Sequence, residues 1–515
     1  MAARRRAADG ASTSDVGGCE PRALPARHPR LLAWILVVFL LGMWGNWAGP
    51  RWNPEPMRSV VVPETPDTAV VGKAPSPPVG TYQIEKRQVQ IRLRDGTSIP
   101  AQLTTPVGVR GLVPGIVFVH GTGTKTTNDF DESTDLISSA GIATLVPMKR
   151  TANYSTTHRD YLALADDYED ALSHLLGVPG VDPKRSGLYT VSEGCFIGPI
   201  IAARNASVSF VVLVSAPVLP IRVQGALAAD AYLRRLGAPS QMREVVSKLV
   251  GQQFGEDFRY IDFDVSQYQR KMTMPVLMAY GTDDMSMPTV QGPVIMRSDL
   301  EKAGNNSLTV RYYKGGHGLK VDGVAQAAPM RDVSDWVNGL PSTASAEPRI
   351  AGEKPVQAYK GKKMAAAPKF ASGKQLVLTL GAGALALIVS SLLLAVGRMR
   401  VRGKRLIDTR GMGACVAASS AGIIVAWCVL VLYLVALAYY AVSYQRNLIV
   451  VQGGWIACQG AALLSAWLFV RVPFRWQEKK PKMRAGAKAV VGAALGGQIV
   501  LLLMLAYWGP FPSLR

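Results

Sequence analysis

Three residue types that together can activate a hydroxyl group occur in the order Ser192, Asp284, His317. Ser192 lies in Thr190-Val-Ser-Glu-Gly194, between a short apolar run and a segment with a helical pattern. A serine at a sharp strand-to-helix turn projects its hydroxyl above the sheet, where a histidine base can take its proton. The three residues therefore predict acyl transfer through a serine nucleophile.

The base and its carboxylate partner each follow a predicted strand. His317 has a glycine on both sides, Gly316 and Gly318, which allows a tight loop. A histidine base needs a carboxylate that fixes its tautomer and stabilises its imidazolium. The spacing Gly-x-x-Asp-x-x-x-Pro favours Asp284 over its neighbour Asp283 for this role, although either aspartate is also a common turn former.

The tetrahedral intermediate of acyl transfer needs two hydrogen-bond donors for its oxyanion. We expect one to be the backbone N–H of Glu193, the residue after the nucleophile. We expect the other from the glycine-rich loop at 120–123, with the N–H of Thr122 as first choice and Gly121 and Gly123 as alternatives. Taken alone, this loop would be an ordinary turn. His120 is predicted to be a structural residue rather than a second base.

The elements that must position these residues lie between about 81 and 340. Strand patterns alternate there with helical ones, which predicts an α/β fold with a mainly parallel sheet and helices on both faces. The stretch 217–272 breaks the alternation and is predicted to form a cap insertion above the strand ends. Of the five cysteines, Cys195 alone lies in this segment, so it holds no internal disulfide. This suits a bacterial envelope protein.

These motifs together resemble the α/β-hydrolase superfamily, and they are most similar to its dienelactone-hydrolase-like and prolyl-oligopeptidase-like branches. The chain order of nucleophile, acid and base is also that of α/β-hydrolases. The resemblance implies the α/β-hydrolase fold, the triad roles of Ser192, Asp284 and His317, and hydrolysis of an ester, thioester or amide. The matching pieces are Asp95-Gly-Thr97, Val117-Phe-Val-His-Gly121, Val181-Asp-Pro-Lys-Arg185, Ser192-Glu-Gly194, Gly281-Thr-Asp-Asp284 and Gly316-His-Gly318.

Two positions depart from the family pattern. Thr190 stands where the turn around the nucleophile commonly has glycine. Met148-Lys-Arg-Thr151 replaces an Asp-x-Arg-Gly run found in many relatives. Because that loop borders the site in the family, its substrate contacts are not carried over to this chain.

Long uncharged runs lie towards both ends of the chain. A run of about 18 apolar residues is long enough to cross a bilayer core as a helix. The first run has a poor cleavage signature at Asn46-Trp-Ala48, so an uncleaved signal anchor is favoured over a cleaved signal peptide. The expected order is a basic leader (1–30), the anchor (31–48), a Pro-rich stalk (49–80), the hydrolase domain (81–340), a linker (341–375), a four-helix transmembrane bundle (376–508) and a tail (509–515).

The formal net charge of +21 lies largely beside the apolar runs, in the leader and in two loops near 398–410 and 471–488. Short basic loops remain on the cytoplasmic side of a membrane. This predicts a multi-pass protein of the cell membrane with a cytoplasmic N-terminus and an extracytoplasmic hydrolase domain. Nucleic acid is not an expected partner, and no cofactor or metal is expected.

The predicted function is therefore that of a membrane-anchored serine hydrolase, most simply a carboxylic ester hydrolase acting on a small-molecule or lipid acyl substrate. The alternatives are a serine peptidase of dipeptidyl or acylaminoacyl type and an envelope acyltransferase, with a non-catalytic scaffold or sensor less favoured. The bundle is expected to anchor the enzyme in the bilayer or to bind a membrane-protein partner. Its polar residues Gln452, Gln459 and Gln498 are expected to join helices rather than form an ion path.

Overall fold

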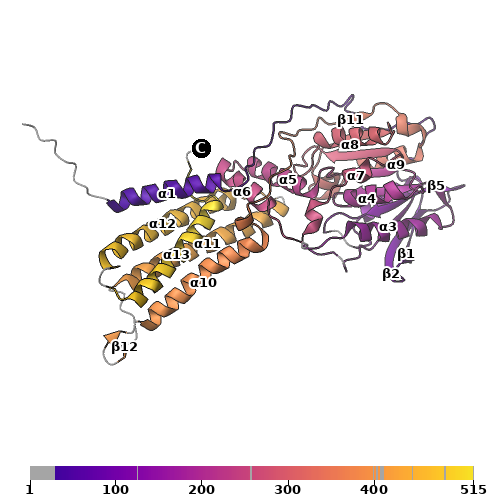
Figure 1. Ribbon diagram of the computed structural model, residues 1–515. Helices are drawn as coiled ribbons and strands as arrows, with labels where there is room; N and C mark the ends of the chain where they lie inside the picture. The colour runs from indigo at the N-terminus through magenta and orange to yellow at the C-terminus, as the bar shows by residue number, and fades with distance from the viewer. Residues whose placement is uncertain are drawn as a thin grey trace, which may run out of the picture.

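The computed structural model describes residues 29–513 except 124–125, 153, 256–257, 398–399, 402–403, 406–410, 444 and 481–482. Most of the basic leader, Cys19 and part of the basic loop near 398–410 lie outside the described residues. Figure 1 shows a domain built on a sheet at one end of the molecule and a group of long helices at the other.

The sheet has nine strands in the order β1-β2-β4-β3-β5-β6-β7-β8-β11. The hairpin of β1 (Ile84–Arg92) and β2 (Ser98–Pro106) is antiparallel, and β2 also pairs antiparallel with β4. All pairings from β4 to β11 are parallel. The remaining strands are β3 (Val113–Val119), β4 (Ala143–Pro147), β5 (Val181–Val191), β6 (Val211–Val214), β7 (Val276–Gly281), β8 (Leu308–Tyr313) and β11 (Ile350–Gly352).

Helices cover both faces of this sheet, which confirms the predicted α/β class. Helices α2 (Asp131–Ser139) and α9 (Ala327–Asn338) pack on one face, where Phe118, Phe210 and Trp336 form the core. The other face is covered by α3 (Tyr161–Leu176), α4 (Gly194–Arg204) and α8 (Gln291–Lys302). Because the central strands are buried on both faces, they are apolar along nearly their whole length.

The segments on either side of the predicted domain are part of it. Strand β11 adds to the edge of the sheet beside β8, so the domain extends past the predicted end at 340. Segment 49–80 also contacts the residues around β11. The Gly352 N–H donates to Thr65 O (2.8 Å), and the Met57 N–H donates to Ala358 O (2.9 Å). Segments 49–80 and 341–375 are therefore docked rather than a free stalk and linker. Because these two segments are rich in proline, they lack the regular strand pattern from which strand pairing can be predicted.

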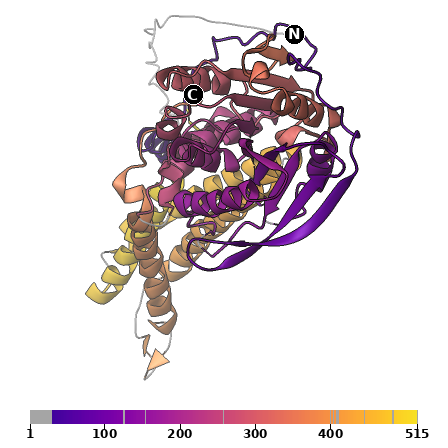
Figure 2. The same cartoon turned by 90° about the vertical axis from the view of Figure 1, so that its right-hand side faces the viewer.

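Among the described residues, five helices are long and apolar enough to cross a membrane. All five overlap the predicted apolar runs. Figures 1 and 2 show them gathered on one side of the sheet domain. They are α1 (Pro29–Trp47), α10 (Gly373–Gly397), α11 (Met412–Val442), α12 (Gly454–Lys479), which a π-helical turn (Ile449–Gly453) precedes, and α13 (Ala485–Tyr507).

Helix α1 is part of the bundle rather than a separate anchor. The Trp34 indole N–H donates to Leu463 O of α12, and the Trp44 indole N–H donates to Leu503 O of α13, both at 3.1 Å. Gly45 lies so close to the carbonyl of Ala506 that a side chain would collide there. Small residues allow such close helix contacts in membranes. The bundle therefore has five helices, where the sequence predicted one anchor and four.

The insertion at 217–272 lies between the sheet domain and the bundle (Figure 1). Its helices α5 (Ile221–Arg235) and α6 (Ser240–Val250) share one apolar core with α11, α12 and α13. Gln452 of the bundle donates to Leu236 O of the insertion (2.8 Å), and the Gln459 amide donates to the Gln241 side chain (3.3 Å). Only the third predicted glutamine, Gln498, joins two bundle helices, since it donates to Val416 O (3.2 Å).

Candidate active site

Ser192 occupies a strained turn between β5 and α4. Its backbone φ is 53°, in the left-handed region that residues with side chains rarely adopt. The Ser192 N–H donates to Val214 O (2.9 Å), which ties the turn to β6. A Cβ atom at Gly194 would lie 2.5 Å from Val119 O, so glycine is required where α4 begins against β3. This is the predicted geometry of a nucleophile turn.

Helix α4 makes room for the Thr190 side chain, which stands where the family pattern commonly has glycine. The Thr190 hydroxyl donates to Val212 O (3.0 Å) and lies 3.2 Å from Cys195 Sγ. One turn into α4, a Cβ atom at Gly198 would lie 2.5 Å from Thr190 Cγ2. The helix thus supplies the space that a glycine on the strand would otherwise provide.

His317 and Asp284 form a close pair. His317 Nδ1 lies 2.8 Å from Asp284 Oδ2, while Asp284 Oδ1 accepts hydrogen bonds from the Ser286 hydroxyl (2.6 Å) and the Ser286 N–H (3.1 Å). Burial favours a higher pKa for Asp284, but His317 and Ser286 together hold that pKa below its ordinary value. Asp284 is therefore charged at neutral pH. Asp283 is exposed at the surface and Asp284 pairs with His317, in agreement with the preference for Asp284 that the Gly-x-x-Asp-x-x-x-Pro spacing indicated.

The His317 loop is fastened to a second strained serine. Ser215, just after β6, has φ 49°, and its hydroxyl accepts a hydrogen bond from the Gly318 N–H (3.0 Å). Two serines that follow adjacent strands thus take the same unusual backbone conformation, one as the candidate nucleophile and one as a support for the base. No motif in the sequence pointed to Ser215.

One cavity of about 550 Å³ brings the predicted site residues together, since Ser192, His317, Gly121 and Thr122 all line it. A Cβ atom at Gly121 would lie 3.3 Å from Ser192 Cβ, so the predicted oxyanion loop passes directly beside the nucleophile. Gly123 has φ 83° and continues that loop. Their roles as oxyanion donors, like the triad roles, remain predictions.

The cavity has an apolar wall and an acidic rim. Tyr189, Leu319 and Met330 contribute to the wall, and Asp129, Asp131 and Glu132 stand at the start of α2. None of the described residues that line the cavity comes from 217–272. The described part of the insertion therefore does not form the predicted cap over the nucleophile: apolar residues of α5 and α6 pack against the bundle, and Val223 and Leu227 of α5 pack with Ile295 of α8.

A buried ionic cluster behind Ser192 was not predicted. The Glu193 carboxylate accepts hydrogen bonds from Lys149 Nζ (2.9 Å), the Tyr161 hydroxyl (3.0 Å), Tyr154 and Arg159. Burial favours a higher pKa for Glu193, but Lys149 and Arg159 hold that pKa below its ordinary value. The only sequence feature that hinted at this cluster was Met148-Lys-Arg-Thr151, the run that departs from the family pattern and contains Lys149.

Lys149 joins the two loops that are predicted to hold the oxyanion donors. Besides the Glu193 carboxylate, its ammonium group donates to Gly121 O (3.0 Å). Lys149 is 2% exposed and Glu193 is 3% exposed, so this charge pair is shielded from solvent. In such surroundings an ion pair needs close geometry and further hydrogen bonds, and both are present here.

Two further reactive side chains near the site have structural surroundings. His120 is fully buried, with its ring nitrogens 2.8 Å from the Tyr168 hydroxyl and 2.9 Å from Thr126 O. Burial lowers its pKa to about 4, so the ring is neutral. Burial also raises the pKa of the Cys195 thiol to about 12, so no thiolate competes with Ser192.

Comparison with known proteins is consistent with this class of fold. Residues 166–322 match the family model described as BAAT / acyl-CoA thioester hydrolase C terminal. A comparison with curated proteins found no match.

Solved structures similar to this chain include three hydrolases. A putative dienelactone hydrolase from Klebsiella pneumoniae is 15% identical, with a TM-score of 0.37, and the match covers 51% of this chain and 100% of that one. Brefeldin A esterase, a bacterial homologue of human hormone sensitive lipase, is 20% identical, with a TM-score of 0.37 and coverage of 53% and 80%. An acylaminoacyl peptidase from Pyrococcus horikoshii is 17% identical, with a TM-score of 0.37 and coverage of 50% and 41%. With its mainly parallel sheet and its serine turn between β5 and α4, the segment from β1 to β11 has the α/β-hydrolase fold, and it is joined to a bundle of five long apolar helices.

Proposed function

We propose that this protein is a membrane-anchored serine hydrolase that cleaves an ester or related acyl bond outside the cytoplasm. The observation that carries the proposal is the meeting, in one cavity, of a serine on a strained turn and a histidine paired with a buried carboxylate at 2.8 Å. The family match, which is to a thioester hydrolase model, makes acyl thioesters a second candidate class of substrate beside oxygen esters.

In the proposed mechanism, Ser192 Oγ attacks the acyl carbonyl while His317 accepts its proton. Asp284 holds the His317 ring through Nδ1 and stabilises the imidazolium. The backbone N–H groups of Glu193 and Thr122 stabilise the oxyanion. His317 then protonates the leaving group, and water releases the acyl group from Ser192 by the same steps in reverse.

The arrangement of the bundle supports an extracytoplasmic hydrolase domain. The end of α13 and the start of α12 share a core with the insertion, so these helix ends lie next to the hydrolase domain. The end of α10 and the start of α11, which flank one connection, and the end of α12 and the start of α13, which flank another, lie at the opposite end of the bundle (Figure 1). Both connections are basic, and basic loops remain in the cytoplasm. The hydrolase domain would then face outward.

The proposal is tested by labelling the full-length, detergent-solubilised protein with a fluorophosphonate probe, which reacts with activated serines. We expect Ser192→Ala to abolish both labelling and hydrolysis of p-nitrophenyl esters. Ser207→Ala is the matched control, because Ser207 is exposed on the surface of the same domain and should keep full labelling. Labelling that persists in Ser192→Ala would reject the assignment of the nucleophile.

A further inference from the structure

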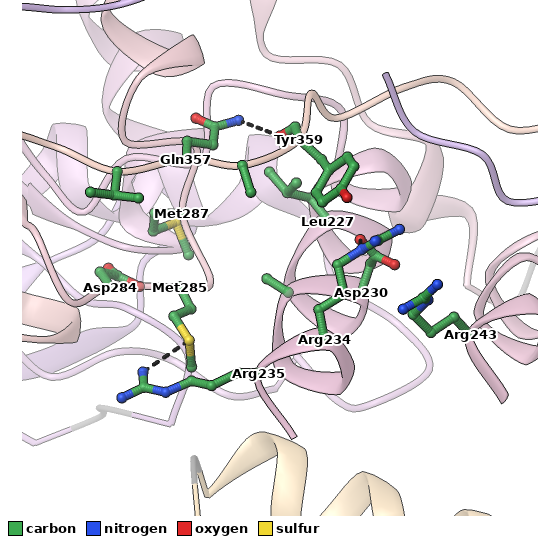
Figure 3. A pocket seen from close by; sticks show the side chains of 13 residues that line it. Leu227, Asp230, Arg234, Arg235, Arg243, Asp284, Met285, Met287, Gln357 and Tyr359 are labelled. Carbon is green, nitrogen blue, oxygen red and sulfur yellow. Dashed lines mark hydrogen bonds and ion pairs between the residues drawn. The ribbon is translucent and has the colours of Figure 1, made fainter. Parts of the chain in front are cut away.

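The loop that follows β7 and carries Asp284 is incompletely packed on its α5 side. A second cavity of about 550 Å³ lies there, between the loop and helix α5 of the insertion. Figure 3 shows Met285 and Met287 of the loop on one side of this cavity and Asp230 and Arg234 of α5 on the other. Because side chains do not fill this space, polar contacts have more influence on where the loop lies.

A hydrogen bond from the first turn of α5 reaches this loop. The Gln224 side-chain amide donates to Ser286 O. Ser286 in turn donates to Asp284 Oδ1 through its hydroxyl (2.6 Å) and its N–H (3.1 Å), and Asp284 Oδ2 lies 2.8 Å from His317 Nδ1. Gln224, Ser286 and Asp284 are all buried, where water cannot replace a lost partner. Gln224 thus fixes the residue that holds the candidate acid.

Arg222, in the same turn of α5, fixes another part of the insertion. Its guanidinium donates to both carboxylate oxygens of Asp262 (2.6 and 3.0 Å), which ends the short helix η1 (Arg259–Asp262). It also donates to Gln252 O (2.7 Å), just after α6. A bidentate pair of this kind fixes orientation as well as distance. The start of α5 therefore determines where η1 lies.

Helix η1 packs behind the nucleophile turn. The Arg159 guanidinium lies 4.8 Å from the centre of the Tyr260 ring, within the range of a cation–π contact, and it donates to the Glu193 carboxylate. The Tyr260 hydroxyl donates to Thr156 O (3.0 Å) in the same loop as Arg159. Tyr260 therefore supports the side chain that binds Glu193, the residue next to the candidate nucleophile.

The other end of α5 contacts the bundle. The Tyr232 hydroxyl donates to Gln445 O (2.9 Å), between α11 and α12, and Gln452 donates to Leu236 O (2.8 Å). Helix α5 thus runs from the bundle to both parts of the candidate site.

We propose that the first turn of α5 is a positioning element for both halves of the candidate site. Gln224 fixes the loop that carries Asp284. Arg222 fixes η1, and through Tyr260 it fixes the support of the nucleophile turn. This inference rests on the proposed serine hydrolase function, and it gives the insertion a role beside the site rather than over the nucleophile.

The test measures steady-state hydrolysis of a p-nitrophenyl ester by the full-length protein in detergent. Gln224→Met keeps the length of the side chain but removes the amide donor. We expect kcat to fall on the order of 10-fold with little change in KM, because a misplaced catalytic group affects mainly the transition state. Gln241→Met is the matched control, since Gln241 of α6 donates to the Ser513 hydroxyl (2.7 Å) and not to the site. It should keep the parent kcat.

A second variant, Ser286→Ala, separates positioning from general damage, because it removes the hydroxyl that binds Asp284. Residues that act as a unit are not additive. Gln224→Met should therefore lower kcat by less than about 3-fold in the Ser286→Ala background. Equal losses in the two backgrounds, or the parent kcat in Gln224→Met, would overturn the proposal.

The contact of η1 is tested at Tyr260, which is only partly buried, so that its replacement leaves the fold intact. Tyr260→Leu removes the ring from Arg159 and should lower kcat by about 3- to 10-fold, whereas Tyr260→Phe keeps the ring and most of kcat. Equal kcat values in these two variants would overturn the proposal, also in the case that Gln224→Met does not fold.

The failure of this proposal is distinguishable from that of the proposed function. Ester hydrolysis that persists in Ser192→Ala would reject the hydrolase proposal. Loss of hydrolysis in Ser192→Ala, together with the parent kcat in Gln224→Met and Tyr260→Leu, would reject the positioning role alone.

Discussion

At the scale of single residues, the oxyanion loops depend on a side chain outside them. A backbone donor lowers the barrier only when it is held where the oxyanion forms. Glu193 carries one predicted donor, and its own carboxylate is bound by Lys149, which also binds Gly121 O. We therefore assign Lys149 a positioning role under the proposed mechanism.

Lys149→Met is expected to lower kcat by about 10- to 100-fold with little change in KM, because the affected donors act mainly on the transition state. Steady-state hydrolysis of a p-nitrophenyl ester measures both constants. Arg150→Met is the matched control. Arg150 is the next residue in the same loop, but it binds Asp167 and Asp95 rather than the turn at Ser192. An equal loss of kcat in the control would indicate general damage to the loop.

Removing one partner of a buried charge pair also costs about 3–5 kcal/mol of stability. The triple variant Lys149→Met, Arg159→Met, Glu193→Gln removes both cations together with their shared carboxylate, so it leaves no unpaired charge and is expected to regain thermal stability. It should not regain kcat, because Gly121 still lacks its ammonium partner. Recovery of kcat along with stability would contradict the positioning role.

The places of Ser192, Asp284 and His317 in the fold were predictable because each depends on local sequence: a strand, a turn residue and a glycine close by. The Lys149–Glu193 pair was not, since its members lie 44 positions apart and nothing local shows that both are buried. Ser215 was missed for a similar reason. Its strained backbone is set by β6, β7 and the His317 loop together.

At the scale of elements, the contact between β5 and α4 explains how a threonine replaces glycine before the nucleophile. Gly198→Ala is expected to destabilise the protein by about 1–3 kcal/mol, because the added methyl group meets Thr190 Cγ2 in a packed core. Thermal unfolding in detergent measures the loss. Thr190→Ser removes that methyl group and keeps the hydroxyl, so in its background Gly198→Ala should cost much less. An equal cost in both backgrounds would show that the strain lies elsewhere.

The alternation of strands and helices was predictable because apolar runs and turn residues mark each element. Strand β11 was not, since it has three residues and owes its conformation to β8 and to the segment at Thr65. The sequence predicted that 217–272 interrupts the alternation of strands and helices, but it did not predict that this insertion packs against the bundle. The apolar residues of α5 and α6 fit a cap or a bundle contact equally well, and only the packed structure distinguishes the two.

At the scale of the whole molecule, the insertion of the hydrolase domain and the bundle share one apolar core, separate from the cores on the two faces of the sheet. Leu233 and Val246 of the insertion are buried in the same cluster as Trp455 and Leu505 of the bundle. The hydrolase domain is therefore not an independent body on a tether.

A segment that ends before α10, covering residues 49–372, is expected to expose this surface. It should bind a hydrophobic dye and self-associate in analytical ultracentrifugation, because contiguous apolar patches of this kind drive association. Replacing Leu233 and Val246 by serine in the segment should reduce both effects. A monomeric segment that binds no dye would contradict the shared core.

The pairing of α1 with α12 and α13 also has a consequence for synthesis. The indole of Trp44 finds its acceptor 459 positions later in the chain. At ribosomal rates of about 5–20 residues per second, roughly 20 to 90 s separate the two. During that interval α1 is without its neighbours, and the hydrolase domain is translated before the helices that support it. The emergence of the final helix is therefore the moment at which both halves of the molecule acquire their permanent partners.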